Sequence, residues 1–256
     1  MEEELAAFKT CAGARLIGRR ILYWPVLVST MAKAREMAEA RVDEGTVIVA
    51  AEQTGGQGRM GRAWLSPKGS LSISVVLYPE LERLPYLNMA ASLATCRAIR
   101  EVTGLKAEIK WPNDVLVGKK KVCGILIESR VEKESLVYAI IGIGMNANFP
   151  TSDLGELSER ATTLSDETGS LVSTPELLRT MLLSLDELYL LPFEDIYWQW
   201  HDNLATLGQR VQIRLDGSAY EGIAESIDRG GNLLLRLDDG RLLTISAGEV
   251  TSFAPV

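Results

Sequence analysis

A glycine-rich segment lies between two stretches with strand patterns, and this arrangement limits the folds open to the chain. Residues 56–61, Gly-Gln-Gly-Arg-Met-Gly, match the dinucleotide-binding fingerprint G-x-G-x-x-G, and residues 46–51 before them read as a strand. The fingerprint works only where a helix begins directly after the glycines. Here residues 66–70 have turn composition, and residues 71–77 have the pattern of a half-buried strand. A Rossmann fold therefore lacks its helix, and the G-x-x-x-x-G-K-[ST] sequence of a P-loop is absent.

The same segment has the composition of a loop that closes over an anion. Its glycines permit positive φ angles and let backbone N–H groups approach a ligand closely. Arg59 and Arg62 supply planar donors that suit phosphate or carboxylate oxygens. The alternative, a flexible hairpin loop without a ligand, stays open on these residues alone.

The composition argues against several other classes of protein. The chain has 256 residues, 46% of them hydrophobic, which is enough for a large core, and it has no apolar run long enough to cross a membrane. Its acidic start and three widely spaced cysteines predict a cytoplasmic protein with reduced thiols. A net charge of −7 argues against nucleic-acid binding as the main task. His201 is the only histidine and is distant in sequence from the glycines, so any chemistry there depends on charge and positioning.

The periodicity predicts two domains, residues 1–207 and 208–256. The first has an α+β pattern that predicts one mixed β-sheet with flanking helices. Its predicted strands are residues 20–24, 46–51, 71–77, 115–117, 122–128 and 136–145, and its predicted helices are residues 3–12, 31–40, 87–102, 174–191 and 193–204. Pro25 places the first strand at an edge or a bulge, and residues 150–173 are turn-rich. Beyond residue 208, glycine turns separate four short strands and predict a small antiparallel barrel; these strands are residues 211–215, 220–224, 233–237 and 242–245.

A second polar cluster is Lys110-Trp111-Pro112-Asn113-Asp114. Pro112 fixes its own φ and biases the residue before it toward an extended backbone, so the cluster forms a stiff corner at the end of a strand. The same composition is typical of an ordinary turn, and that alternative stays open. Ser29 and Thr30 cap the predicted helix at 31–40, and we expect the amides of that helix start to lie beside the glycine-rich segment.

In this order and spacing, the clusters resemble the motifs of biotin protein ligases. The glycine-rich segment resembles that family's G-R-G-R-x-G-R-x-W, and residues 110–114 match its K-W-P-N-D. Further matches are residues 29–31 to S-T-x, 121–125 to K-x-x-G-I, 143–146 to a G-x-G-I-N-like segment and 161–164 to an A-T-S-L-like stretch. The resemblance covers roughly residues 20–253. It implies a catalytic domain like that of class II aminoacyl-tRNA synthetases, followed by an SH3-like barrel.

The resemblance also implies a reaction and its site residues. Biotin and ATP, with Mg²⁺, would be condensed to biotinyl-5′-AMP with release of pyrophosphate, and biotin would then pass to a lysine of a biotin carboxyl carrier domain. The implied biotin-binding residues are Ser29, Thr30, Gln53, Gly56, Gly58, Arg59, Lys121 and Gly124. The implied adenylate-binding residues are Arg59, Arg62, Trp64, Asn113, Lys121 and Asn146, and the implied catalytic residues are Arg59, Arg62, Lys110, Asp114 and Lys121. Asp114 would hold Mg²⁺ or orient Lys110, and Trp64 would be a wall of the site or a core anchor.

The implied chemistry suits a chain with one distant histidine. Bringing a carboxylate to a triphosphate requires cations that offset their repulsion, and an ionised carboxylate attacks phosphorus without a general base. In the second half-reaction, Asp114 would be the acceptor for the proton of the carrier lysine.

Three departures from the family pattern qualify the resemblance. Gln57 stands where arginine is usual, so we expect a looser loop or weaker adenylate binding. Ala32 and Lys33 stand where an acidic residue or asparagine is common. About 19 residues precede the first strand, too few for a helix-turn-helix domain, so we expect no DNA binding.

Other functions and partners stay open at this point. The alternatives are a lipoate–protein ligase, which shares the fold but lacks the arginine-rich loop, and a non-catalytic biotin or nucleotide sensor. An exposed strand beside the site is expected to pair with the carrier or with a second subunit in a homodimer.

Overall fold

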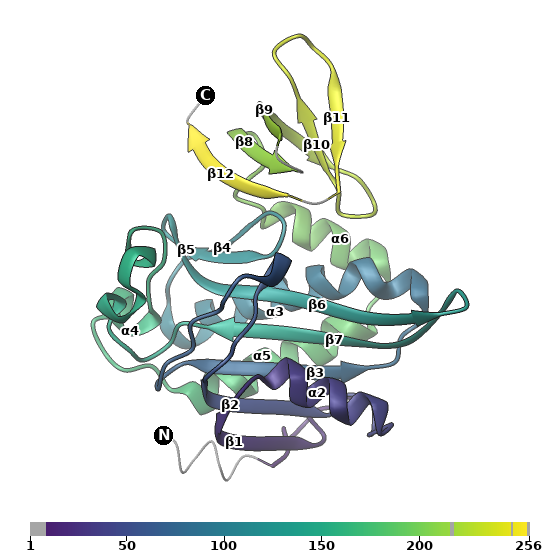
Figure 1. Cartoon of the computed structure of the whole chain (residues 1–256), viewed down its shortest axis with the longest axis vertical. Helices are drawn as coiled ribbons and strands as arrows, with labels where there is room; N and C mark the ends of the chain where they lie inside the picture. The colour runs from purple at the N-terminus through teal and green to yellow at the C-terminus, as the bar shows by residue number, and fades with distance from the viewer. Residues whose placement is uncertain (1–8, 216–217, 247, 255–256) are drawn as a thin grey trace.

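The computed structural model describes residues 9–215, 218–246 and 248–254, and it has two parts (Figure 1). The larger part is a seven-stranded sheet with the order β1-β2-β3-β7-β6-β5-β4. Its strands are β1 (Ile21–Leu27), β2 (Val47–Gln53), β3 (Leu71–Leu77), β4 (Ala107–Lys110), β5 (Asp114–Val117), β6 (Lys120–Glu132) and β7 (Ser135–Met145). β1 and β2 are parallel and the other neighbours are antiparallel, which confirms the predicted mixed sheet. β1, which contains Pro25, is an edge strand as predicted.

Helices cover the two faces of this sheet unequally. One face carries α2 (Thr30–Glu39), which lies over β2, β3 and β7 and packs Met31 and Ala34 against Ile48, Val76 and Ile140. The other face carries α3 (Leu84–Thr103), α5 (Thr174–Leu190) and α6 (Phe193–Asp202). The part of the first face beyond α2 is therefore free for a binding site.

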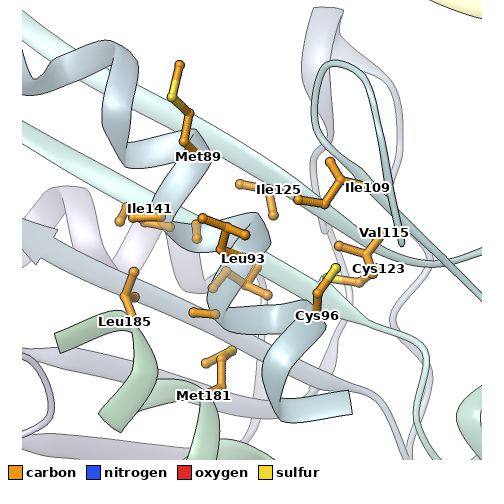
Figure 2. Packing of buried hydrophobic residues seen from close by; sticks show 14 of the residues in the cluster. Met89, Leu93, Cys96, Ile109, Val115, Cys123, Ile125, Ile141, Met181 and Leu185 are labelled. Carbon is orange, nitrogen blue, oxygen red and sulfur yellow. The ribbon is translucent and has the colours of Figure 1, made fainter. Parts of the chain in front are cut away.

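α3 is the centre of the hydrophobic core. Pro85 lies in its first turn, and Gly104 ends it with a φ of 71°. The helix is buried on more than one side because it packs between the sheet and α5. Figure 2 shows Leu93 of α3 among Ile141 of the sheet and Leu185 of α5. Each such fully buried aliphatic side chain contributes about 1.5–3 kcal/mol.

The C-terminal part is an antiparallel sheet with one more strand than predicted. Its strands are β8 (Arg210–Leu215), β9 (Ser218–Ile227), β10 (Leu233–Arg236), β11 (Leu242–Ile245) and β12 (Glu249–Ala254), in the order β11-β10-β9-β8-β12. β12 was not predicted because its start, Glu-Val-Thr-Ser, has little apolar content. Among the strands that the structure describes, β11 and β12 do not pair, so the sheet is open and the predicted barrel closure is not seen.

Two further sequence expectations had mixed outcomes. The predicted helix at residues 3–12 falls mostly on residues 1–8, which lie outside the described residues, and residues 9 and 10 have no assigned helix or strand. Residues 150–173 were predicted to be turn-rich, and they also contain a 3-10 helix, η3 (Thr151–Glu159), and a short helix, α4 (Leu164–Thr168). α4 has only 5 residues, between the caps Thr163 and Gly169, and so short a helix cannot show the periodic apolar pattern that predicts helices in a sequence. None of the helices in the described ranges has the length and apolarity needed to cross a membrane.

Candidate active site

A cavity of about 630 Å³ lies on the same face of the large sheet as α2, over the part of that face that α2 does not cover. Of the fourteen predicted site residues, thirteen line it: Ser29, Thr30, Gln53, Gly58, Arg59, Arg62, Trp64, Lys110, Asn113, Asp114, Lys121, Gly124 and Asn146. Gly56 is the exception. A Cβ there would lie less than 3.0 Å from the carbonyl oxygen of Trp64, so Gly56 permits the loop to fold tightly rather than lining the cavity.

The floor of the cavity is a row of residues that crosses the strands. Paired positions place Asp114 of β5 beside Gly124 of β6, Gly124 beside Gly144 of β7, and Gly144 beside Ser72 of β3. Lys110 of β4 extends the row beyond Asp114. Charged residues therefore lie at one end and glycines in the middle, and at its other end the row passes to Ser72, which is buried behind the cavity lining.

Buried hydroxyls and one amide form the neutral end of the cavity. Gln53 Oε1 accepts from the backbone N–H of Thr30 at 2.7 Å and from its Oγ1 at 3.1 Å. Gln53 Nε2 donates to Ser72 Oγ at 3.1 Å, which in turn contacts Ser66 Oγ at 2.7 Å. Ser74 Oγ donates to Thr30 Oγ1 at 2.9 Å. These bonds fix the amide so that a second Nε2 hydrogen remains for a ligand atom that accepts.

Glycines leave the middle of the floor bare, and larger side chains lie over it. The indole of Trp64 covers Gly124 and Gly144, and the Met31 side chain covers Gly142. A Cβ at Gly144 would collide with the indole ring. Trp64 Nε1 is buried and has no hydrogen-bond partner among the described residues. Trp64 therefore lines the cavity as a wall and, through the same ring, packs on Gly124 and Gly144 of the sheet.

The glycine-rich segment forms an ordered hairpin over the cavity. Gln57 pairs with Ala63, the N–H of Gly58 donates to the Arg62 carbonyl at 2.7 Å, and the Trp64 N–H donates to the Gly56 carbonyl at 2.9 Å. Its tip is a 3-10 turn, η1 (Arg59–Gly61). The segment is therefore a hairpin, and Gly58, Arg59, Arg62 and Trp64 of it line the cavity.

Cationic side chains dominate the other end of the cavity. Arg59 Nη1 donates to Asn113 Oδ1 at 2.8 Å, while Asn113 Nδ2 donates to the Ile125 carbonyl at 2.6 Å. Lys121 Nζ lies 2.6 Å from Asp114 Oδ1 and 5.2 Å from the centre of the Trp64 ring. The lining contains six cationic side chains, Arg59, Arg62, Lys110, Lys119, Lys121 and Arg160, and two carboxylates, Asp114 and Glu159. This local excess of four positive charges contrasts with the net charge of −7 of the chain.

Comparison with known proteins gives a consistent result. The model of the Biotin/lipoate A/B protein ligase family matches residues 23–146, and that of the Biotin protein ligase C terminal domain matches residues 206–251. A biotin protein ligase structure from Aquifex aeolicus in complex with biotin and ATP superposes with a TM-score of 0.76 at 31% identity, covering 92% of this chain and 99% of that chain. Bifunctional ligase/repressor BirA of Bacillus subtilis is 35% identical over 233 residues, 88% of this chain and 72% of that protein. Biotin–[acetyl-CoA-carboxylase] ligase of Paracoccus denitrificans is 35% identical over 234 residues, 87% of this chain and 96% of that protein. The chain belongs to the biotin protein ligase family.

Several lining residues of this biotin protein ligase family member were not predicted. Lys119 and Arg160 add positive charge, and Met31 and Gly144 shape the floor. Gly144 falls inside a matched motif, and Arg160 directly precedes another, so proximity to the motifs was the available signal. Gly248, from the C-terminal sheet, also lines the cavity, and nothing in its own sequence neighbourhood indicates that.

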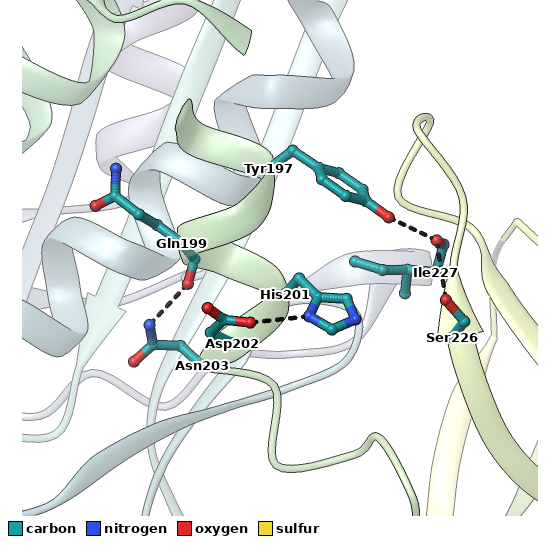
Figure 3. Close-up of polar contacts among 7 residues, drawn as sticks. All are labelled: Tyr197, Gln199, His201, Asp202, Asn203, Ser226 and Ile227. Carbon is teal, nitrogen blue, oxygen red and sulfur yellow. Dashed lines mark hydrogen bonds and ion pairs between the residues drawn. The ribbon is translucent and has the colours of Figure 1, made fainter. Parts of the chain in front are cut away.

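The two groups that most often act as base or nucleophile elsewhere take no part in this ligase site. His201 lies on α6, does not line the cavity, and pairs with Asp202 at 3.1 Å (Figure 3). Cys123 is adjacent to Gly124 but fully buried, and burial raises the pKa of its thiol. The described lining of the site thus offers hydrogen bonds, positive charge and two carboxylates, but neither an imidazole nor a thiol.

Proposed function

We propose that this chain activates biotin as biotinyl-5′-AMP with release of pyrophosphate and then transfers biotin to a lysine of a biotin carboxyl carrier domain. The observation that carries the proposal is the polarity of the cavity. One end offers fixed neutral hydrogen bonds that suit the ureido group of biotin, and the other offers an excess of cations that suit a triphosphate.

The residues divide the work along this axis. Ser29, Thr30 and Gln53 would hold the ring system of biotin, and its aliphatic chain would run along Trp64, the wall that packs on the glycine floor. The length of this aliphatic chain would then bring the carboxylate of biotin toward Arg59 and Lys121. A carboxylate oxygen attacks the α-phosphorus, the bond from that phosphorus to the bridging oxygen of the β-phosphate breaks, and pyrophosphate leaves with that oxygen.

Charge stabilisation and positioning carry this step without a general base. Arg59, Arg62, Lys110 and Lys121 lower the repulsion between the two anions and stabilise the charge that develops on the phosphoryl oxygens. In the second step, a neutral lysine amine attacks the acyl carbon, the bond from that carbon to the phosphate oxygen breaks, and AMP leaves. Asp114 would accept the proton of that amine.

The donor set suits a Mg²⁺ ion that arrives with ATP rather than a metal site built by the protein. The described residues contain no group of three or more His, Cys, Asp or Glu side chains that could hold a metal ion. Asp114 supplies one carboxylate, and Mg²⁺ in such sites takes its remaining ligands from phosphates and water. Bound Mg²⁺ would offset charge on the phosphates.

The proposal also assigns domains, partners and location. Residues 1–207 would form the biotin- and ATP-binding domain, with Asn113 and Asn146 on the nucleotide side, and residues 208–256 an SH3-like domain. The carrier domain is the proposed macromolecular partner. The alternative is that an exposed strand beside the site pairs with a second copy of this chain in a homodimer. Cytoplasmic location is proposed because ATP is the second substrate and the three cysteines are free thiols in the structure.

Pyrophosphate release tests the function directly. The protein is incubated with ATP and Mg²⁺ plus either biotin or lipoate, and pyrophosphate is measured in each case. We expect release with biotin and little with lipoate. Release with lipoate alone would assign the chain to lipoate ligation, and no release with either acid would contradict adenylation.

A further inference from the structure

Trp111 joins the turn at residues 110–114 to the C-terminal sheet. Its ring is buried, with 1% exposed, and its Nε1–H donates to the carbonyl of Gly231 at 2.9 Å. Gly231 belongs to the turn between β9 and β10 at residues 228–232, called the docking turn below. Since Lys110, Asn113 and Asp114 flank Trp111 and line the cavity, one side chain links the C-terminal sheet to the cationic end of the site.

The segment between the two domains holds the same turn from another side. The Ile109 N–H donates to the Asn203 carbonyl at 3.0 Å, and the Ala205 N–H donates to the Ile109 carbonyl at 2.8 Å. The backbone N–H of Trp111 donates to Oγ1 of Thr206, which is fully buried, at 2.9 Å. The inter-domain segment therefore pairs along β4 up to the beginning of the 110–114 turn.

The docking turn is itself rigidly built. Asp228 Oδ1 accepts from the N–H groups of Gly230 at 2.8 Å and Asn232 at 2.9 Å, and its Oδ2 accepts from Asn232 Nδ2 at 2.8 Å. Just before it, the Ile227 carbonyl accepts from Tyr197 Oη at 2.8 Å, a bond drawn in Figure 3. A turn fixed in this way holds the Gly231 carbonyl in one place.

We propose that Trp111 is a positioning residue through which the docking turn holds Lys110, Asn113 and Asp114 in the geometry that adenylation needs. The inference rests on the proposed function, because it takes the cationic end of the cavity as the ATP end. Catalysis by charge stabilisation is sensitive to displacements on the order of 1 Å. The neutral end depends instead on β2, β3 and α2, so biotin binding does not depend on this link.

The test compares two buried tryptophans that both lie beside Gly231, of which only Trp111 donates to its carbonyl and belongs to the turn at residues 110–114. Trp200 is as deeply buried as Trp111, and its Nε1–H donates to Ser92 Oγ at 3.0 Å, away from the 110–114 turn. Trp111→Phe and Trp200→Phe each remove one buried indole N–H and should lower the unfolding temperature alike. Trp111→Phe should lower kcat/KM for ATP in biotin-dependent pyrophosphate release about tenfold, with the Kd for biotin within about twofold of the unmodified protein. Equal effects of the two variants on ATP, or none from Trp111→Phe, would overturn the inference.

A second variant acts from the far side of the link. Asp228→Ala loosens the docking turn without touching the cavity, and it should lower kcat/KM for ATP in the same way. Because both changes break one link, the double variant Trp111→Phe/Asp228→Ala should be no slower than the worse single variant. Effects that multiply would show two separate causes and contradict the link.

Hydrogen exchange supplies a measurement that does not depend on activity. Amides at residues 108–116 should exchange faster in Asp228→Ala than in the unmodified protein, and those of α2 should not. An unmodified protein that releases no pyrophosphate with biotin would defeat the proposed function, whereas unchanged exchange at residues 108–116 would defeat the link alone.

Discussion

At the scale of single residues, the site is defined by which atoms are already engaged. Gln53 has its oxygen occupied by Thr30 and one amide hydrogen occupied by Ser72. A ligand therefore meets a donor at this position rather than a choice of donor and acceptor. The orientation is held from both sides, because the backbone N–H of Thr30 requires an acceptor and Ser72, which contacts Ser66, accepts from Nε2.

Ser72→Ala should weaken biotin binding with little effect on the chemical step. The change removes the acceptor for Gln53 Nε2, so the amide is held on its Thr30 side alone, and the lost bond amounts to about 1–2 kcal/mol, or roughly tenfold in KM for biotin. Initial rates at varied biotin and saturating ATP measure this, with kcat expected to change by less than about threefold. Ser70→Ala is the matched control, since Ser70 is also buried but its Oγ has no partner among the described residues. An equal rise in KM for both variants would argue against an orienting role.

At the scale of elements, the glycine-rich hairpin and the sheet act as lid and floor. The bond between Arg59 and Asn113 ties the tip of the hairpin to the turn at residues 110–114 across the cavity. This contact joins segments 54 residues apart in sequence. Sequence patterns predicted both segments, but not that they bond to each other.

Arg59→Gly should allow the intermediate to escape from the lid. Loss of a charge-assisted hydrogen bond of this kind costs about 1.5–3 kcal/mol, so release of biotinyl-5′-AMP should be faster by about tenfold or more. Release is measured by trapping free adenylate after a single turnover. Arg59→Lys keeps the charge without the planar fork and should lie between the two, and retention that is the same in all three proteins would remove Arg59 from this role.

Two glycines of β7 should differ in their tolerance of a methyl group. A Cβ at Gly144 meets the rigid indole of Trp64, whereas a Cβ at Gly142 meets the Met31 Sδ at 2.5 Å, the far part of a flexible side chain. Gly144→Ala should therefore lower biotin affinity at least about tenfold, and Gly142→Ala by less. Calorimetric titration with biotin measures the affinity of both variants. A larger loss of affinity in Gly142→Ala than in Gly144→Ala would contradict the rigid packing of Trp64 on Gly144.

The sequence predicted the elements of this site well and their mutual contacts poorly. Strand and helix periods placed most of the mixed sheet, and the motif residues come together around one cavity. The row from Asp114 through Gly124 to Ser72 follows from strand register, which depends on pairings between segments far apart in the chain. The contribution of Gly248 depends on how the two sheets are placed, and no local pattern encodes it.

At the scale of the whole molecule, the core fixes buried groups in their neutral forms. Burial raises the pKa of Cys96 to about 12 and also raises the pKa of Cys123, and burial with a bond to Glu44 raises the pKa of Tyr189. Well below pH 9, these thiols are protonated in both the folded and the unfolded state, so they add no pH dependence. Above it, the unfolded state loses its protons first, and the folded state loses stability as pH rises.

The free energy of unfolding should fall steeply in alkaline solution. For Cys96, the loss at about pH 10.5 amounts to about 2 kcal/mol, since each pH unit above the unfolded pKa contributes about 1.4 kcal/mol. Urea unfolding at a series of pH values measures the slope. Cys96→Ala should start from a lower stability but show a shallower decline above pH 9, and a slope unchanged by this substitution would show that other groups cause it.

The cavity floor is a row of residues that crosses neighbouring strands, so the site depends on the number of residues in each strand as much as on their identity. Sliding β7 by one position would bring Ile143 or Met145 to the place of Gly144 and fill the cavity with a side chain. The turn at Lys133 and Glu134, at the far end of the β6–β7 hairpin, has no such constraint. Insertions there leave the frame of every strand intact, whereas a single inserted codon within β7 would erase the site without altering one motif residue.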